Sequence, residues 1–340
     1  MLVKPLVSIL VPAYNAEETI EAAIRSALAQ TWLRKEVIVV DDGSKDRTVE
    51  IVERFGSRVR LVTTNNRGAA SARNEAFRLC GGDYIQWLDA DDLLAADKIE
   101  RQIQSVQQSD SRRLLLATSW APFYYRNRFA KFIKNSLCQD LSPADWLIRK
   151  LSENLHMQTG TWLTSRDLAE AAGSWDTRLL SDDDGEYFCR VLLASGGTRF
   201  TEGTGVFYRV TPSNRLSHIG QSDPKKDAML ISIKLHMQYL RSLEDSERVR
   251  EACLTYLQNW YPTFYPERAD IVKEMQNLAA QLGGRLEEPR LRWKFAWMKP
   301  VFGWRIAKSA QSELPHLKLS CIRRFDKAMY KLENRRITMR

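Results

Sequence analysis

The 340-residue sequence lacks the features that would indicate several common classes of protein. Its five cysteines are far apart and form no Cys-x-x-Cys pair, which argues against a zinc or redox site and favours a reducing, cytosolic compartment. No apolar run reaches the length of a bilayer span, and no signal-peptide pattern precedes the first apolar segment. We therefore expect a soluble protein, or one bound peripherally to a membrane.

Two common phosphate-binding motifs are also absent. No Gly-x-Gly-x-x-Gly follows a predicted strand, and no Gly-x-x-x-x-Gly-Lys-Ser/Thr occurs anywhere. A nucleotide site in this chain would therefore need a metal ion and a cationic side chain to neutralise its phosphates. Asp91 is the candidate for the metal and Arg73 for the phosphate.

Positive charge is concentrated near the C-terminus. Residues 285–340 carry 15 Lys and Arg against 5 Asp and Glu, a net charge of +10, whereas the whole chain carries +9. The same segment is rich in large apolar residues, namely Trp293, Phe295, Trp297, Phe302, Trp304 and Ile306. This mixture predicts either contact of 285–340 with an anionic membrane, or a helical bundle or homo-oligomer interface whose basic residues face water.

Apolar runs and helical periodicities alternate along the first part of the chain. They predict strands at 7–12, 37–41, 59–63, 84–88 and 113–118, separated by helices at 17–30, 46–55, 69–80 and 95–109. Strict alternation favours a doubly wound, mostly parallel sheet of the α/β class. Further helices are predicted near 142–151, 164–172 and 182–195, short β segments at 198–201 and 205–210, and helical sequence from about 225 onward. We divide the chain into an α/β domain, 1–220, and a helical, basic C-terminal region, 221–340.

Two of the predicted strands end in carboxylates. One is followed by Asp89-Ala90-Asp91-Asp92 and the other by Asp41-Asp42-Gly43-Ser44. Carboxylates crowded this closely repel one another unless a divalent cation or hydrogen-bond donors neutralise them. Because ligands of open α/β sheets bind at the C-terminal ends of the strands, both clusters predict one shared crevice. The alternative is that Asp, Gly and Ser only terminate these strands as turn residues.

Four segments in order resemble the successive motifs of family 2 glycosyltransferases: 7–15, 41–44, 66–74 and 82–92. The resemblance covers about residues 5–215. It implies the GT-A fold, which is Rossmann-like with a mostly parallel central sheet flanked by helices, here followed by a helical C-terminal extension. It also implies an inverting, metal-dependent hexosyl- or N-acetylhexosaminyl-transferase that uses Mn²⁺ or Mg²⁺.

The resemblance further implies substrates and a cellular role. The donor would be a nucleotide sugar, with UDP favoured, and the acceptor a glycan or lipid-linked glycan. The reaction would belong to bacterial surface polysaccharide or lipopolysaccharide assembly, in the cytoplasm or at the inner face of the plasma membrane.

Individual residues acquire roles from the same resemblance. The donor would be bound by Pro12, Ala13, Tyr14, Asp42, Asn66, Gly68, Arg73, Asp89 and Arg209. Tyr14 would lie beside the base and Asp42 would accept a hydrogen bond from it. The metal would be held by Asp91 and Asp89, with Asp91 as the direct ligand and Asp89 also reaching the sugar or ribose.

A third acidic cluster, 181–186, resembles the catalytic acidic segment of the family. Counting back from Arg190 assigns the catalytic positions to Asp183 and Asp184, with Asp184 as the base that accepts a proton from the acceptor hydroxyl. Asp182 is an extra carboxylate, so the register could shift by one residue. These acids would equally suit the N-terminus of a helix.

Two other functions stay open on the sequence alone. The isoelectric point near 9.3 and the basic, Trp-rich tail would fit a nucleic-acid-binding protein. Residues 1–284 carry a net charge of only −1 and contain no recognisable nucleic-acid module, so we expect no nucleic-acid partner. A catalytically inactive nucleotide- or glycan-binding relative is the second alternative, and the presence of Asp91 and Asp184 argues against it.

Overall fold

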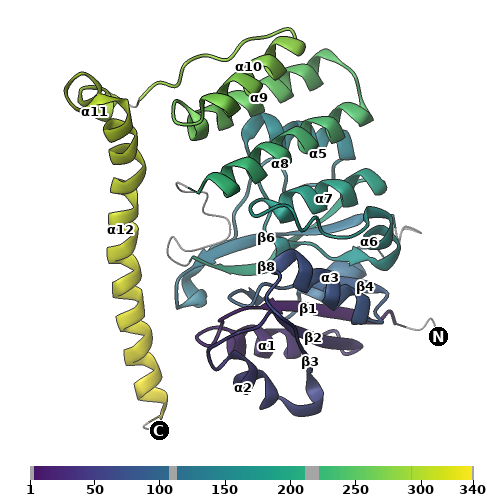
Figure 1. Ribbon diagram of the computed structural model, residues 1–340. Helices are drawn as coiled ribbons and strands as arrows, with labels where there is room; N and C mark the ends of the chain where they lie inside the picture. The colour runs from purple at the N-terminus through teal and green to yellow at the C-terminus, as the bar shows by residue number, and fades with distance from the viewer. Residues whose placement is uncertain (1–3, 107–112, 211–221, 292, 339–340) are drawn as a thin grey trace.

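The computed structural model describes residues 4–106, 113–210, 222–291 and 293–338 (Figure 1). The strands are β1 (Val7–Ala13), β2 (Lys35–Asp41), β3 (Arg60–Thr63), β4 (Tyr84–Trp87), β5 (Leu93–Leu94), β6 (Leu115–Phe123), β7 (Thr164–Ser165) and β8 (Thr198–Arg209). The helices of the same part are α1 (Ile20–Leu28), α2 (Thr48–Glu53), α3 (Ala69–Leu79), α4 (Lys98–Gln104), α5 (Pro143–Glu153), α6 (Arg166–Ala172) and α7 (Asp183–Ala194). Short 3₁₀ turns are η1 (Gly56–Arg58), η2 (Asn127–Phe129) and η3 (Thr159–Thr161).

The larger sheet has the strand order β3-β2-β1-β4-β7, parallel except for β7. Every residue of β1 is buried, as expected for a central parallel strand that is covered on both faces. Helix α1 covers one face with Ile20, Ala23, Ile24 and Ala27, which recur at helical spacing. The predicted α/β class and its mostly parallel sheet are therefore confirmed.

Three expectations for the second half of the domain are wrong in detail. The strand predicted at 113–118 is β6, which does not belong to the larger sheet. It pairs with β8 in a separate three-stranded sheet of order β5-β8-β6. The β segments expected at 198–201 and 205–210 form one strand, β8, whose pairing with β6 shifts register between Thr118 and Ser119. The helix expected at 164–172 begins two residues later, because Thr164 and Ser165 pair with β4 as β7 and the Ser165 hydroxyl caps α6.

The C-terminal region is helical, as predicted. It contains α8 (Asp223–Leu243), α9 (Glu247–Phe264), α10 (Ala269–Gln281), α11 (Trp293–Ala296) and α12 (Met298–Thr338), with a break at Gly303. Helices α8 and α9 pack against α7 and α5 of the preceding region. In Figure 1, α12 runs as a long helix along one side of the molecule, apart from α8–α10. Among the described residues, no helix combines the length and apolar character needed to cross a bilayer.

Helix α12 is attached to the segment that follows β6. Asp326 accepts hydrogen bonds from the backbone N–H of Tyr125 and pairs with the Arg126 guanidinium at 2.6 Å. Glu333 contacts the same guanidinium at 3.1 Å, and the rings of Tyr125 and Tyr330 lie 6.0 Å apart. These partly buried contacts fix one part of the basic tail on the α/β domain.

Candidate functional site

The sheet register brings the acidic and polar loops to one edge. Ala13 pairs with Asp41, and Asp41 pairs with Thr63, so the loops after β1, β2 and β3 leave the sheet side by side. A cavity of about 1200 Å³ opens there and extends to helices α5, α8 and α9. Of the residues given site roles above, it is lined by Pro12, Ala13, Tyr14, Asp42, Asn66, Gly68, Arg73, Asp89, Asp91, Asp183 and Asp184.

Asp42 organises the loop that precedes α3. Its carboxylate accepts hydrogen bonds from the backbone N–H groups of Arg67, at 2.9 Å, and Gly68, at 2.7 Å. Gly68 has φ +91°, a left-handed conformation that a residue with a side chain rarely adopts, and it directly precedes α3. Asp41 is fully buried beside it and binds the backbone N–H of Ser44 at 3.0 Å. Asp42 therefore shapes the pocket wall, and its predicted contact with a base stays a prediction.

Replacing Asp42 by Ala is expected to destabilise the protein by about 1 to 3 kcal/mol, because two backbone N–H groups would lose their acceptor. Urea unfolding followed by tryptophan fluorescence measures the change. Asp42→Asn, which keeps one acceptor oxygen, is the matched control and should lose less. A midpoint for Asp42→Ala equal to that of the wild-type protein would contradict this account of the loop.

The loop after β4 carries the first acidic cluster. Asp89 and Asp91 line the cavity, whereas Asp92 is buried and accepts a hydrogen bond from the backbone N–H of Arg209 at 2.8 Å. The Arg209 guanidinium donates to the backbone carbonyls of Asp91, at 2.8 Å, and Tyr124, at 3.0 Å. Arg209 is absent from the cavity wall, so in this structure it supports the loop that carries Asp91.

Arg73 joins two acidic clusters that are distant in the sequence. From the buried face of α3 it contacts Asp89 at 2.9 Å and Asp183 at 2.7 Å, and its guanidinium lies 4.4 Å from the ring centre of Trp175. Burial by itself would lower the pKa of Arg73, but the attraction of Asp183 and Asp89 raises it, so the group stays charged. Its Nε–H is buried without an acceptor among the described residues. Arg73 thus links the strand-end acids to the acids of α7 at the wall of the cavity.

The third acidic cluster begins α7. Asp182 lies just before the helix with φ +55°, and the helix starts at Asp183, so this cluster does form a helix N-terminus. Asp183 faces Arg73, whereas Asp184 accepts hydrogen bonds from the Thr159 hydroxyl, at 3.0 Å, and from the backbone N–H of Gly185, at 2.9 Å. The neighbouring carboxylates thus have different partners.

Burial also affects the protonation of Asp183. It raises the pKa of Asp183 to about 6, against the attraction of Arg73 and with the repulsion of Asp184 and Asp89. Asp183 can therefore change its charge near neutral pH. Because its ionised form pairs with Arg73, that change would alter the charge balance of the whole cavity.

The donor atoms of the site suit a hard divalent cation. Asp89 and Asp91 both line the cavity, and carboxylate oxygens are the ligands that Mg²⁺ and Mn²⁺ prefer. Within the ranges that the structure describes, no group of three or more His, Cys, Asp or Glu residues could hold an ion by itself. A cation bound here would therefore need further oxygen ligands, such as those of a diphosphate.

Sequence reasoning missed several residues that complete the cavity. Thr159 comes from η3, and the wall formed by α5, α8 and α9 contributes Trp146, Lys150, Met229, Tyr256 and Trp260. These residues come from four elements without a motif in common, so no local pattern could have identified them. Trp175, whose ring faces the Arg73 guanidinium, does not line the cavity itself and lies six residues before the third acidic cluster.

The chain resembles known proteins mainly in its first part. Residues 8–135 match the model of Glycosyl transferase family 2. The chain is 44% identical over 107 residues to the UDP-Glc:alpha-D-GlcNAc-diphosphoundecaprenol beta-1,3-glucosyltransferase WfgD of Escherichia coli. The aligned residues make up 31% of this chain and 42% of that protein. It is 37% identical over 130 residues to an uncharacterized glycosyltransferase of Rickettsia typhi, and this alignment covers 38% of this chain and 41% of that protein. The matched part thus spans about two fifths of these curated relatives.

Solved structures share the fold over most of the chain. S. aureus TarS 1–349 in complex with UDP-GlcNAc superposes with a TM-score of 0.63 at 17% identity and covers 89% of this chain and 90% of that one. The mannosyltransferase PcManGT from Pyrobaculum calidifontis, solved with GDP-Man and Mn²⁺, has a TM-score of 0.53 at 19% identity, covering 92% and 85%. The comparisons therefore place residues 8–135 in glycosyl transferase family 2 and show a fold shared with TarS 1–349 over most of the chain.

Proposed function

We propose that this protein is an inverting, metal-dependent glycosyltransferase that moves a hexose or N-acetylhexosamine from a UDP-sugar to an acceptor hydroxyl. The observation that carries the proposal is the single cavity lined by both the strand-end acids and the acids of α7, with Arg73 between them. That arrangement offers one place for a diphosphate and another for a general base. The named donors of the two solved relatives, UDP-GlcNAc and GDP-Man, support the donor class.

The donor would occupy the half of the cavity at the sheet edge. Tyr14, half exposed at the end of β1, would stack against the base, while Asn66 and Gly68 would line the ribose and diphosphate. Arg73 would share the charge that develops on the leaving nucleoside diphosphate. Asp91 and Asp89 would hold Mn²⁺ or Mg²⁺, which supplies Lewis-acid stabilisation of the diphosphate when bound.

Asp184 would act as the general base. Its hydrogen bonds from Thr159 and Gly185 fix the carboxylate at the wall of the cavity, whereas Asp183 is held by Arg73. The acceptor hydroxyl would give its proton to Asp184 as its oxygen attacks the anomeric carbon. A single displacement of this kind inverts the anomeric configuration.

Turnover with a panel of nucleotide sugars tests the proposal. We expect purified protein with Mn²⁺ to release UDP from at least one UDP-hexose or UDP-N-acetylhexosamine, slowly with water as acceptor and faster with a glycan or lipid-linked glycan. Chelation of the metal should stop the release. Absence of nucleotide release and of nucleotide binding across UDP, GDP and their sugars would reject it.

The rate of donor turnover is expected to fall as the pH drops below about 6, because Asp183 then becomes protonated and no longer balances Arg73. Rates measured between about pH 5 and pH 8 would show an acidic limb with an apparent pKa near 6. Asp183→Asn, which does not titrate, is expected to lose that limb and to retain only low activity. A rate that stays constant down to about pH 5 would contradict this role of Asp183.

We also propose that the tail holds the enzyme at an anionic membrane, where a lipid-linked acceptor of bacterial polysaccharide or lipopolysaccharide assembly would be presented, at the cytoplasmic face. Trp293 and Trp297 are 80% and 61% exposed, and Val301, Phe302 and Ile306 are also exposed nearby. Together with the +10 charge of 285–340, these side chains suit an interface that carries anionic headgroups. The acceptor named for the WfgD relative is a diphosphoundecaprenol, which agrees with a lipid-linked substrate.

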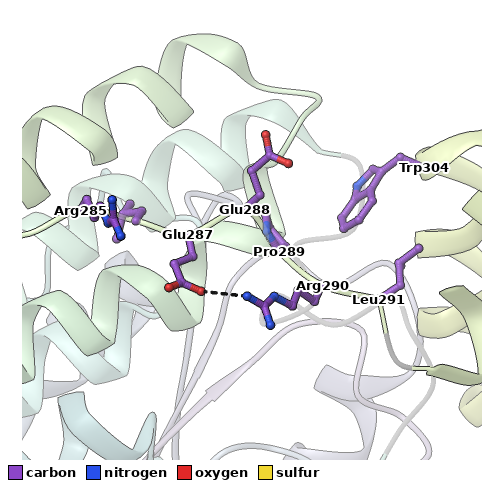
Figure 2. Close-up of a pocket in the computed structure, with 8 residues that line it drawn as sticks. Arg285, Glu287, Glu288, Pro289, Arg290, Leu291 and Trp304 are labelled. Carbon is purple, nitrogen blue, oxygen red and sulfur yellow. Dashed lines mark ion pairs between the residues drawn. The ribbon is translucent and has the colours of Figure 1, made fainter.

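The first residues of this tail, between α10 and α11, form a second cavity that contains none of the predicted site residues. It measures about 590 Å³ and is formed by residues 285–291 together with Trp304, with Glu287 and Arg290 paired at 3.6 Å (Figure 2). Its wall carries both signs of charge in a short segment. Because it is formed by this segment and Trp304 of α12, and by none of the predicted site residues, we assign it to the attachment of α12 rather than to the transfer reaction.

Co-sedimentation with phosphatidylglycerol-containing vesicles is expected to fall several-fold when Trp293 and Trp297 are both changed to Ser, because the interfacial aromatic rings are lost. Leu33→Ser, at a residue that is 86% exposed elsewhere on the surface, is the matched control and should bind like the wild type. Equal binding by all three proteins would contradict the membrane contact. A dimer that the tryptophan changes convert to monomer would favour the homo-oligomer interface instead.

A further inference from the structure

We propose that Ser232 and His236, both on α8, are positioning residues that hold the carboxylate of Asp182 and thereby aim Asp184 into the cavity. This inference rests on the proposed function, because it assumes that Asp184 is the base. It extends the catalytic apparatus to helices α8 and α9, which lie outside residues 8–135 matched by the family model.

The backbone at Asp182 is the point that needs support. Its φ of +55° is left-handed, a conformation that a residue with a side chain rarely adopts. The turn there sets the direction in which α7 begins, one residue before Asp183 and two before Asp184. A contact that keeps Asp182 in this conformation therefore controls where both acids point.

Ser232 supplies the first contact. Its hydroxyl donates to Oδ2 of Asp182 at 2.5 Å, a short, charge-assisted hydrogen bond, and Ser232 itself is fully buried. The Asp182 side chain carries no hydrogen bond to the N-terminus of its own helix. Its carboxylate is thus held by the neighbouring helix rather than used as a helix cap.

His236 faces the same carboxylate from one turn further along α8. Its Nε2 lies 3.8 Å from Oδ2 of Asp182, and its Nδ1 lies 2.9 Å from the Tyr256 hydroxyl of α9. Burial lowers the pKa of His236 well below its usual value, so the ring is neutral and has one N–H. If the Tyr256 hydroxyl donates to Nδ1, the ring proton sits on Nε2 and its N–H dipole points toward Asp182.

The Asp182 carboxylate lies directly against Gly185. A Cβ atom at Gly185 would collide with that carboxylate, so the first turn of α7 leaves its space to the Asp182 side chain. The backbone N–H of Gly185 in turn donates to Asp184 at 2.9 Å. The chain of contacts from Ser232 through Asp182 and Gly185 therefore ends on the proposed base.

Ser232→Ala tests the hydrogen bond, with Ser242→Ala as matched control on the same helix. The Ser242 hydroxyl donates only to the carbonyl of Tyr239 within α8 and is exposed. We expect Ser232→Ala to lower kcat for donor turnover by about tenfold or more, with KM for the donor within about twofold of the wild type, because misaimed catalytic groups lose rate rather than binding. Ser242→Ala should keep wild-type kcat.

His236→Gln and His236→Asn separate positioning from packing. His236 Nε2 makes no hydrogen bond among the described residues and faces Asp182 only at 3.8 Å, so its contact is electrostatic. A glutamine amide places an N–H group about as far out as Nε2, whereas an asparagine amide reaches only as far as Nδ1. We expect His236→Gln to retain kcat within about threefold and His236→Asn to lose about tenfold, although both remove the ring and should lower the melting temperature alike. Equal kcat for the two variants would overturn the proposal, as would wild-type kcat for Ser232→Ala.

Nucleotide release by the wild-type protein shows whether the proposed function or only the positioning role has failed. If it releases no nucleotide from any donor, the proposed function fails before the positioning residues are tested. If it turns over a UDP-sugar and the Ser232 and His236 variants follow only their melting temperatures, the glycosyltransferase stands and the positioning role is refuted.

Discussion

Replacing Asp184 by Asn is expected to leave nucleotide binding intact while lowering the rate of sugar transfer by about 10²- to 10⁴-fold. The amide keeps the shape of the side chain and can still accept a hydrogen bond from Thr159. It cannot, however, take the proton of the acceptor hydroxyl. Titration of UDP by calorimetry measures binding, and release of UDP from the donor measures turnover.

The neighbouring acids provide the controls. Asp183→Asn neutralises one of the two carboxylates that hold Arg73 and should weaken nucleotide binding as well as turnover. Asp167→Asn, on an exposed position of α6, should change neither. If Asp183→Asn keeps binding and loses turnover while Asp184→Asn stays active, the base is one residue earlier than proposed.

Replacing Asp91 by Ala is expected to abolish the metal-dependent part of nucleotide binding. Bridging a diphosphate through a divalent cation contributes several kcal/mol, so the loss should weaken the affinity for UDP in Mn²⁺ by about a hundredfold or more. The fold should persist, because Asp92, and not Asp91, holds the backbone N–H of Arg209 through its carboxylate. Calorimetric titration of UDP with Mn²⁺ present measures the effect.

Wild-type protein without metal, prepared with a chelator, is the control for Asp91→Ala. Wild-type protein in chelator should bind UDP as weakly as Asp91→Ala does in Mn²⁺, and the melting temperatures of the two proteins should be similar. If Asp91→Ala keeps full affinity and its turnover survives chelation, the donor diphosphate is neutralised in another way, with Arg73 as the nearest candidate.

Alternating strands and helices could be predicted because each element carries its own pattern. The continuous apolar run of β1 and the helical spacing of Ile20, Ala23, Ile24 and Ala27 are local signals that packing does not override. The acids at the ends of β2 and β4 could also be predicted to meet, since parallel strands end at one edge of a sheet. The cavity indeed collects both.

Other parts of the fold depend on pairings that no local pattern reveals. Strands β5 and β7 have two residues each, which is too short for a recognisable alternation, and the assignment of β6 to the second sheet depends on its distant partner β8. The attachment of α12 depends on Arg126 and Asp326, 200 residues apart. The contact of Ser232 with Asp182 is likewise a tertiary contact between two helices.

The acidic cluster of α7 shows most clearly which contacts could not be predicted from the sequence. Three carboxylates follow one another in the sequence, and the left-handed turn at Asp182 points them in different directions. Asp182 contacts Ser232 of α8, Asp183 contacts Arg73, and Asp184 contacts Thr159. Which carboxylate faces which partner is decided by three different elements. Composition and spacing could therefore locate the cluster and suggest Asp184 as the base, but they could not identify the partner of each carboxylate.

A crystal structure of the protein with UDP and Mn²⁺ tests the central claim most directly. We expect the base beside Tyr14, the diphosphate between Arg73 and Asp91, and the metal bound to Asp91 and to the diphosphate oxygens, with Asp184 facing the vacant sugar position. UDP bound elsewhere, or bound in the cavity without contact to Arg73 or Asp91, would contradict the account.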